Sequence, residues 1–359
     1  MVRVGITDLP LHCGECPAWL FQRMKKLGKA LTEIIVFEYG KDEFLRRISN
    51  PFFFQSFACV VGFDWHSSGT TTTLTGALKE ANLKEFGIAV LGGKGKASKK
   101  TPQEIEALAE EFSFSDKKIE ELKKASKLAA KVDNVALQDG FQLYHHSFIV
   151  TEGGKWAVIQ QGMNLENKYA RRYHWLSEKV KSFVNEPHLA ICCDMKTKPL
   201  NMVAEESEEA RKCCVDLVND NPIHLKKYLA PSKEQKTLFK YLKMPVEHEI
   251  ELDNYKALQE AFEQQPKNFE ELLQIKGIGP KTIRALALIS NLVFGAELSW
   301  RDPVKYSFAH GGKDGHPYPI DRKTYDESIR LLQEAIQQAK LNNKEKIEVI
   351  KRLNAFFKI

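Results

Sequence analysis

The stretch NFEELLQIKGIGPKTIRALALIS, residues 268–290, has the pattern of two short helices joined by a glycine turn. Asn268 is followed three residues later by Glu271, which is the signature of a helix N-cap with its reciprocal partner. Apolar residues recur at helical spacing on both sides of the glycines, and Pro280 suits the first position of the second helix. The segment therefore predicts a helical hairpin that turns at Gly277-Ile278-Gly279.

The predicted turn has the features of a phosphate-binding site. Glycines allow a close backbone approach, and the N–H groups at the start of the second helix can donate to an anion. The pattern resembles a helix-hairpin-helix DNA-binding motif, which grips the sugar-phosphate backbone without reading bases. We assign nucleic-acid contacts in this turn to Lys276, Gly277, Ile278, Gly279, Lys281 and Thr282. The alternative is an ordinary glycine-capped hairpin packed in a helical bundle.

The composition of the 359 residues indicates a globular protein. Hydrophobic residues make up 43% and aromatic residues 10%, which is enough to build buried cores. The net charge of +6 is mild, so a polyanionic partner has to be argued from local clusters of lysine. Seven cysteines, several of them adjacent, form a poor disulfide framework, and Cys13 with Cys16 alone is weak evidence for zinc. No apolar run is long enough to span a membrane, so we expect a cytoplasmic protein.

We expect two domains. Residues 1–230 predict an α/β (or α+β) domain with a mixed sheet and a central β-hairpin over residues 138–164. Residues 231–359 predict an all-α domain that contains the helix-hairpin-helix motif. Further predicted elements are strands at 34–37, 59–63 and 87–91, helices over 103–132, 165–185 and 205–229, and two terminal helices over 321–340 and 345–357.

Acidic and imidazole side chains lie close to the predicted strands. Asp64 and His66 follow the strand predicted at 59–63, while Asp139 precedes the central hairpin that carries His145 and His146. This layout resembles that of metal-dependent nucleases, although Gln160 and Gln161 stand where such enzymes carry a Glu-x-Lys pair. Glutamine is a poorer metal ligand and cannot act as a general base, which weakens the likeness.

From these residues we derive a candidate divalent-metal site for Mg²⁺ or Mn²⁺. Its expected ligands are Asp64, His66, Asp139 and one of His145 or His146, with His12 as a base or further ligand and Gln160 and Gln161 nearby. The alternative is a purely structural role for these residues. Asp64 and the Ser- and Thr-rich segment after it would then cap a helix, and the histidines would form hydrogen bonds with buried polar groups.

Further cationic residues extend the predicted nucleic-acid surface. A glycine-rich loop after the strand at 87–91 carries Lys94, Lys96, Lys99 and Lys100. Arg171 and Arg172 lie among aromatic residues in the helix predicted over 165–185, a mixture that suits phosphate contacts and base stacking. Lys313 lies in a long loop between Trp300 and Asp321, and loops of this length are usually functional.

Several blocks of sequence together resemble a known family. They include Gly62-Phe-Asp-Trp-His-Ser-Ser-Gly69, Gly92-Gly-Lys-Gly95, Trp156-Ala-Val-Ile-Gln-Gln-Gly-Met163, Arg172-Tyr-His-Trp175 and Phe308-Ala-His-Gly-Gly-Lys-Asp-Gly315. The chain resembles, over nearly its whole length, the prokaryotic family catalogued as domain of unknown function 763. The resemblance implies a cytoplasmic protein with a helix-hairpin-helix near its C-terminus, and no particular reaction.

The leading hypothesis is a nucleic-acid-processing protein, a divalent-metal nuclease of DNA repair that holds double-stranded DNA. The sequence does not decide between DNA and RNA, and it permits a homodimer with no membrane partner. One alternative is a non-enzymatic DNA- or RNA-binding component of a repair complex. Another is a DNA glycosylase in which Lys281 and Asp321 act, although their separation is about double that expected of such enzymes.

Overall fold

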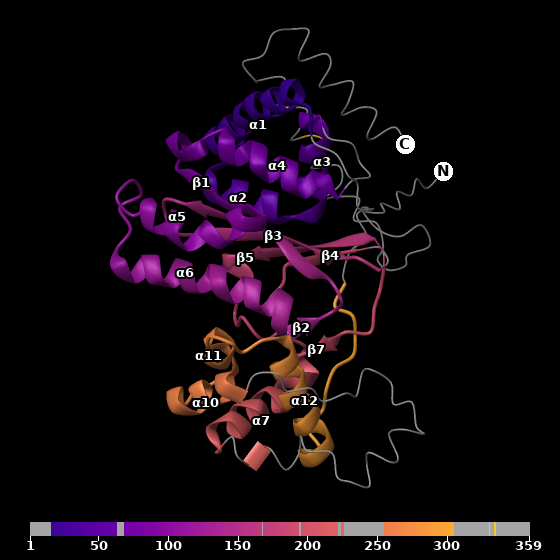
Figure 1. Ribbon diagram of the computed structural model, residues 1–359. Coiled ribbons are helices and arrows are strands. Elements are labelled where there is room, and N and C mark those ends of the chain that lie inside the picture. The colour runs from indigo at the N-terminus through magenta and orange to yellow at the C-terminus, as the bar shows by residue number, and fades with distance from the viewer. Residues whose placement is uncertain are drawn as a thin grey trace.

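The computed structural model describes residues 16–62, 68–166, 168–193, 195–221, 224–225 and 255–304, together with residues 330 and 334. Within this part of the chain, helices are packed on both faces of a central sheet (Figure 1). None of the helices in these ranges is long and apolar enough to cross a membrane.

The central sheet has five strands in the order β1-β3-β4-β5-β6, and every ladder between them is antiparallel. Its strands are β1 (Ile88–Lys94), β3 (Gln142–Thr151), β4 (Trp156–Asn164), β5 (Tyr169–Leu176) and β6 (Ala190–Cys192). A second, two-stranded sheet pairs β2 (Leu137–Gln138) with β7 (Leu200–Asn201). The prediction of a mixed sheet is therefore wrong for the described strands, because β3, β4 and β5 follow one another through short connections and β1 also pairs with β3 in the antiparallel sense.

Four helices cover one face of the sheet: α1 (Ala18–Tyr39), α2 (Lys41–Ser49), α3 (Pro51–Val61) and α4 (Gly69–Glu80). Their apolar faces share a hydrophobic core with alternate residues of the strands, including Ile149 and Ile159. The single-turn helix η1 (Leu83–Phe86) connects α4 to β1.

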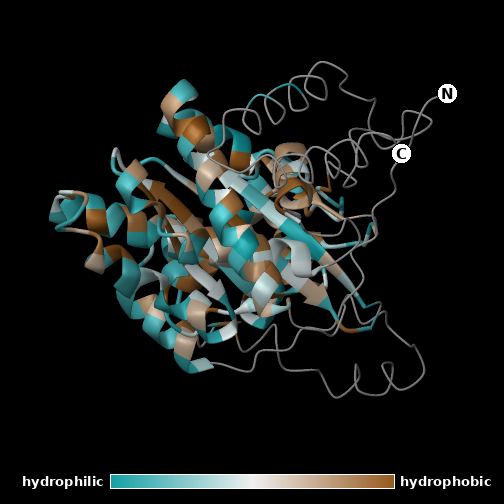
Figure 2. Ribbon diagram, turned by 90° about the horizontal axis from the view of Figure 1, so that it is seen from above, coloured by the Kyte–Doolittle hydropathy of each residue, from teal (hydrophilic) through white to brown (hydrophobic). Residues whose placement is uncertain are grey.

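The opposite face is covered by α6 (Asp116–Lys131), with the short helices η2 (Gly95–Lys100) and α5 (Thr101–Ala107) before it. α6 continues into a π-helical turn, η3 (Val132–Ala136). The single-turn helix η4 (Ser177–Lys179) follows β5, and its Glu178 bonds to Arg46 of α2. Beyond α6 lie η5 (Glu205–Ser207), α7 (Glu208–Asn219), α10 (Tyr255–Gln264), α11 (Phe269–Gln274) and α12 (Pro280–Phe294). One hydrophobic core runs from the strands through α6 to these last helices. Seen from above, the helix ribbons nearest the viewer change between apolar and polar colours along their length (Figure 2).

Two predicted strands are helical. Residues 34–37 belong to α1, and residues 59–61 belong to α3. A short apolar run fits a buried helix as well as a buried strand. The helix signal for α3 was present at its start, where Asn50 caps the amides of Phe52 and Phe53 and is followed by Pro51.

The opposite error concerns residues 165–185, where the predicted helix is replaced by β5 and η4. Tyr173 and Trp175 point to the face covered by α6, while His174 lies against Phe54 of α3. The strand is buried on both faces and therefore lacks the alternation of polar and apolar residues that identifies a half-buried strand.

Other predictions are confirmed. The central hairpin is formed by β3 and β4, β1 covers the strand at 87–91, and α5 and α6 occupy most of the predicted helical region 103–132. α7 covers residues 208–219 of the helix predicted over 205–229. His12, Cys13, the loop around Lys313 and the helix predicted over 345–357 lie outside the described residues, as does the helix predicted over 321–340 apart from residues 330 and 334.

Gly92, in β1, provides a direct test of this packing. Its φ of +81° lies in the left-handed region, and an added Cβ would overlap the carbonyl oxygen of His146 on β3. We expect Gly92→Ala to lower the free energy of unfolding by about 3 kcal/mol, because strain and overlap act together. Gly95→Ala is the matched control: φ is +60° there, but the added methyl meets open space, so we expect a loss of about 1 kcal/mol. Equal losses in urea denaturation would contradict this packing.

Candidate nucleic-acid interface and buried polar site

The turn between α11 and α12 lies at the surface and is anchored by one apolar side chain. Ile278 is 1% exposed, whereas Lys276, Gly277, Pro280 and Lys281 are exposed. Gly277 has a φ of +87°, as the glycine turn requires. At the start of α11, the Asn268 carboxamide accepts from the Glu271 amide at 2.9 Å, as the sequence predicts. The Glu271 carboxylate reaches back to the Lys267 amide, one residue earlier than predicted.

The carbonyl side of the turn faces the rest of the protein. Lys131 of α6 donates to the carbonyl of Ile278 at 2.7 Å, and Lys127 donates to the carbonyl of Gln274 at 2.9 Å. The Gln138 carboxamide donates to the carbonyl of Pro280 at 2.8 Å. Burial lowers the pKa of Lys131, and the nearby charge of Lys127 lowers it further. Three donors thus fix the inner side of the turn and leave Lys276 and Lys281 on its outer side.

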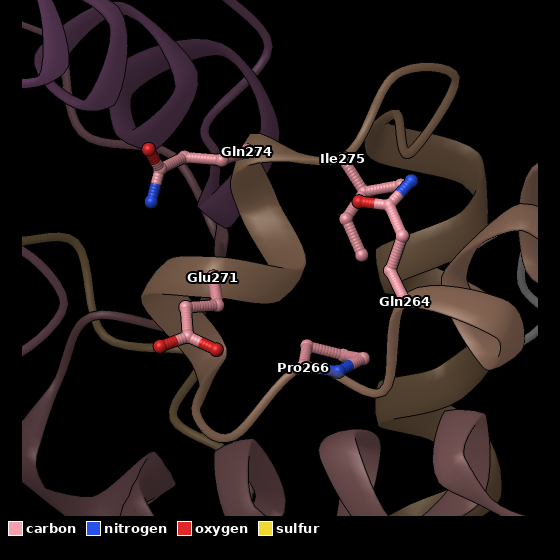
Figure 3. A pocket seen from close by; sticks show the side chains of 5 residues that line it. All are labelled: Gln264, Pro266, Glu271, Gln274 and Ile275. Carbon is pink, nitrogen blue, oxygen red and sulfur yellow. The ribbon is translucent and has the colours of Figure 1, made fainter.

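A pocket of about 270 Å³ adjoins this turn and is lined by Gln264, Pro266, Glu271, Gln274 and Ile275 (Figure 3). Its one charged lining residue is Glu271. A carboxylate at the wall disfavours a phosphate inside the pocket, so the cationic outer side of the turn is the better candidate for an anion.

The predicted lysine loop forms the end of β1 and the helix η2, with Lys94, Lys96, Lys99 and Lys100 all exposed. Lys99 and Lys127 line one cavity, and Lys127 also bonds to the carbonyl at the end of α11. The lysine loop and the turn therefore lie on either side of α6. This connection places two of the predicted cationic segments near one another.

Arg171 and Arg172 are not available to a nucleic acid in this structure, because both are 0% exposed on β5. Arg172 donates to Gln55 at 3.1 Å and to Thr71 at 3.3 Å, and stacks on Phe54. Burial lowers the pKa of Arg172 to about 10. The prediction for these two arginines depended on an exposed helix, and a strand covered on both sides replaces it.

Asp139 is part of a buried ionic network and not an open carboxylate. One oxygen accepts from Arg171 at 2.9 Å and from the Tyr173 hydroxyl at 2.7 Å, and the other accepts from the Phe141 amide at 3.0 Å. Arg171 also bonds to Asp302 at 2.8 Å. Burial raises the pKa of the Asp139 carboxyl, while Arg171 and Tyr173 oppose the rise. Its oxygens are thus already used by protein donors.

His145 and His146 are neighbours on β3 and point to opposite faces of the sheet. On the face of α4, the Thr75 hydroxyl donates to the Thr71 carbonyl at 2.8 Å and lies 3.0 Å from Nε2 of His145. Nε2 of His145 therefore donates its hydrogen to Thr75. Burial lowers the pKa of His145 to about 3, with smaller contributions from His146 and Lys94.

His146 belongs to a separate network under α6. Its Nδ1 lies 2.8 Å from Oε1 of Gln160, and its Nε2 lies 2.9 Å from Oγ of Ser126. The Gln160 amide nitrogen donates to Asp133 at 2.5 Å, and the same carboxylate accepts from Trp175 at 2.9 Å and contacts His188. Burial lowers the pKa of His146, although Gln160 and Asp133 oppose the change.

The two glutamines are likewise separated by the sheet, because Gln160 pairs with His146 and Gln161 pairs with His145. Gln161 accepts from Thr71 and donates to the Ser68 carbonyl at 2.7 Å and to the Tyr144 hydroxyl. Both are 0% exposed. Each is thus a buried hydrogen-bonding link within its own core.

Two of the proposed metal ligands, Asp139 and His145, do not come together. Asp139 binds Arg171 and Tyr173 on the face of α6, whereas His145 binds Thr75 on the face of α4. Asp64, His66 and His12 lie outside the described residues. Across the described ranges, no three His, Cys, Asp or Glu side chains are grouped so as to hold a metal ion. Asp139 and His145, the described members of the predicted set, are held by other protein groups, so the metal site stays a prediction.

Sequence reasoning missed Ser126 and Asp133, which complete the His146 network. They lie seven residues apart, on α6 and on the π-helical turn that follows it. π-helical turns are frequent at functional sites, but one cannot be recognised from the charged and small residues of this region. The pairing of His146 with Gln160 could have been found from the register of the central hairpin.

The buried histidines predict how stability depends on pH. The folded-state pKa of His145, about 3, lies below its ordinary value of 6.5, so below pH 6.5 the unfolded chain binds more protons. Stability should fall as the pH falls from 6.5 toward 3, with each such histidine contributing a slope of about 1.4 kcal/mol per pH unit. His145→Gln should remove one such contribution. Urea denaturation between pH 7 and pH 4 measures the slope for this variant and for the parent protein, and identical slopes would contradict the assignment.

Comparison with curated proteins and with solved structures finds no match. A family model matches residues 5–320, which is most of the chain and includes both the central sheet and the turn between α11 and α12. The chain belongs to the family described as protein of unknown function (DUF763).

Proposed function

We propose that the protein binds the backbone of a nucleic acid, double-stranded DNA in the first instance, through the exposed residues of the turn at 275–282. Thr282, also predicted to make contact, is only 3% exposed, so its side chain is not available. The main observation behind the proposal is that protein donors bind the carbonyl groups on one side of this turn, while the lysines on its other side are exposed. Lys131 and Gln138 hold its carbonyl groups on the inside, while Lys276 in the turn and Lys281 in the first turn of α12 are exposed. The first-turn amides of a helix have no acceptor within the helix, so an anion is a natural partner there.

The contact of Lys131 with the turn also supports binding of a phosphate at the start of α12. Its ammonium bonds to the carbonyl of Ile278, which shares a peptide group with the Gly279 amide. A positive charge on the carbonyl side polarises the peptide group and makes its N–H a better donor. α12 adds the positive end of its helix dipole at the same place. These contributions favour a phosphate oxygen whatever the base sequence.

The exposed lysines of η2 and the end of β1 provide a second contact region on the other side of α6. Such contacts carry no base information and make binding depend on salt concentration. The protein is therefore proposed to recognise duplex backbone without preference for sequence. The described residues add no support for metal-dependent cleavage, because Asp139 and His145 are held by other protein groups.

The first test removes the two exposed lysines of the turn. In fluorescence anisotropy with a short DNA duplex, Lys276→Ala/Lys281→Ala should weaken binding. It should also reduce the slope of log affinity against log salt by about 1.8, since two phosphate contacts are lost. Arg23→Ala/Lys26→Ala is the matched control, because it removes the same charge from α1 on the opposite face of the sheet. Equal losses in the two double variants would show that the turn is not the contact.

A second test separates the support of the turn from direct contact. Lys131→Met keeps the side-chain stem but removes the ammonium that bonds to Ile278, so we expect duplex affinity to fall by about tenfold, or about 1.4 kcal/mol. Lys117→Met, in the first turn of the same helix, is the control for loss of one charge. If Lys131→Met and Lys117→Met bind the duplex with equal affinity, Lys131 does not support the turn for binding.

A further inference from the structure

The network around His146 has the geometry of an activated hydroxyl. The Ser126 Oγ lies 2.9 Å from His146 Nε2, and His146 Nδ1 lies 2.8 Å from Gln160 Oε1. A hydroxyl within hydrogen-bond reach of a base, with that base oriented by a third group, is the arrangement of nucleophilic catalysis.

The proton positions follow from the hydrogen bonds. The Gln160 amide nitrogen donates to Asp133 at 2.5 Å and to the Ala129 carbonyl at 3.2 Å, so its Oε1 faces His146 as an acceptor. His146 Nδ1 must then carry the hydrogen, and Nε2 holds a lone pair directed at Ser126. The Ser126 hydroxyl consequently donates to His146, which is the direction a general base requires.

The orienting end of the network is fixed by Asp133. Its carboxylate receives hydrogen bonds from Gln160 and Trp175 and contacts His188. Asp133 belongs to the π-helical turn after α6, which places it beneath β4 and β5. Asp133 is thus a positioning residue that acts through Gln160.

Ser126 and His146 are not sealed inside the core. Both line a cavity of about 240 Å³ between η2, α6 and β3, which is also lined by Lys99, Lys127 and Gln160. Both lysine side chains are exposed. A group that enters the cavity would therefore meet the hydroxyl beside positive charge.

We propose that Ser126 is a nucleophile, with His146 as its general base, for a small phosphoric ester bound in this cavity. Two lysines at the wall favour an electrophile whose oxygens carry negative charge. The Ser126 oxygen forms a bond to phosphorus while its proton passes to His146 Nε2, and the bond from phosphorus to the leaving oxygen breaks. The proton on His146 then passes to the leaving oxygen, and serine retains the phosphoryl group until water displaces it.

The test uses small probes that need no contact with the turn at 275–282, so its outcome is independent of nucleic-acid binding. Diisopropyl fluorophosphate should phosphorylate Ser126 with loss of fluoride, and mass spectrometry of the digested wild-type protein should locate the group. Methyl 4-nitrophenyl phosphate should release a burst of one nitrophenolate per chain. Absence of both the label and the burst, or a label on another serine, would overturn the proposal.

Variants test the roles of the individual residues. Ser126→Ala should abolish labelling, whereas Ser98→Ala should not change it, since Ser98 lines the same cavity but bonds to the Gly95 carbonyl. His146→Gln should slow labelling by about 100-fold, because no base remains. Gln160→Met keeps His146 but removes the group that orients it, and should also slow labelling. This second variant tests the role of the base even if the His146→Gln protein does not fold. Labelling at the wild-type rate in both variants would overturn the role of His146 as general base. A burst of nitrophenolate from 4-nitrophenyl acetate, but not from the phosphate probe, would overturn the assignment of a phosphoric ester as substrate.

Discussion

The structure depends on a sheet that is buried on both faces. Because side chains alternate along a strand, consecutive residues of β3, β4 and β5 enter two separate cores. A buried polar side chain on these strands is stabilised when it finds a partner within its own core. Asp139 with Arg171, His145 with Thr75 and His146 with Gln160 are three results of this one constraint. The constraint also explains why residues close together in sequence do not share a site.

Local signals could be read from the sequence, whereas the environment of each residue could not. The two helices around Gly277 were predicted correctly because caps, glycine and proline act within a few residues. The fully buried elements α3 and β5 were misassigned, since burial on all sides removes the periodicity that distinguishes helix from strand. The interpretation of Arg171 and Arg172 failed with β5, because their exposure depended on that assignment.

The candidate sites differ in the same way. Lys276 and Lys281 could be selected because a lysine beside a glycine turn is recognisable from the local sequence alone. His146 and Gln160 were selected for metal chemistry, but their partners Ser126 and Asp133 depend on how α6 docks on the sheet. No spacing in the sequence encodes that docking. The exposed lysines of the turn could therefore be predicted from the sequence, whereas the complete His146 network required the structure.

Lys127 has a position that follows from the docking of α6 between the other elements. Its ammonium is bonded to the end of α11, and its side chain forms part of the wall beside Ser126. A displacement of α11 would consequently change the shape and charge of a chamber on the far side of α6. Replacing this one residue would therefore disturb both the support of α11 and the wall of the cavity at once.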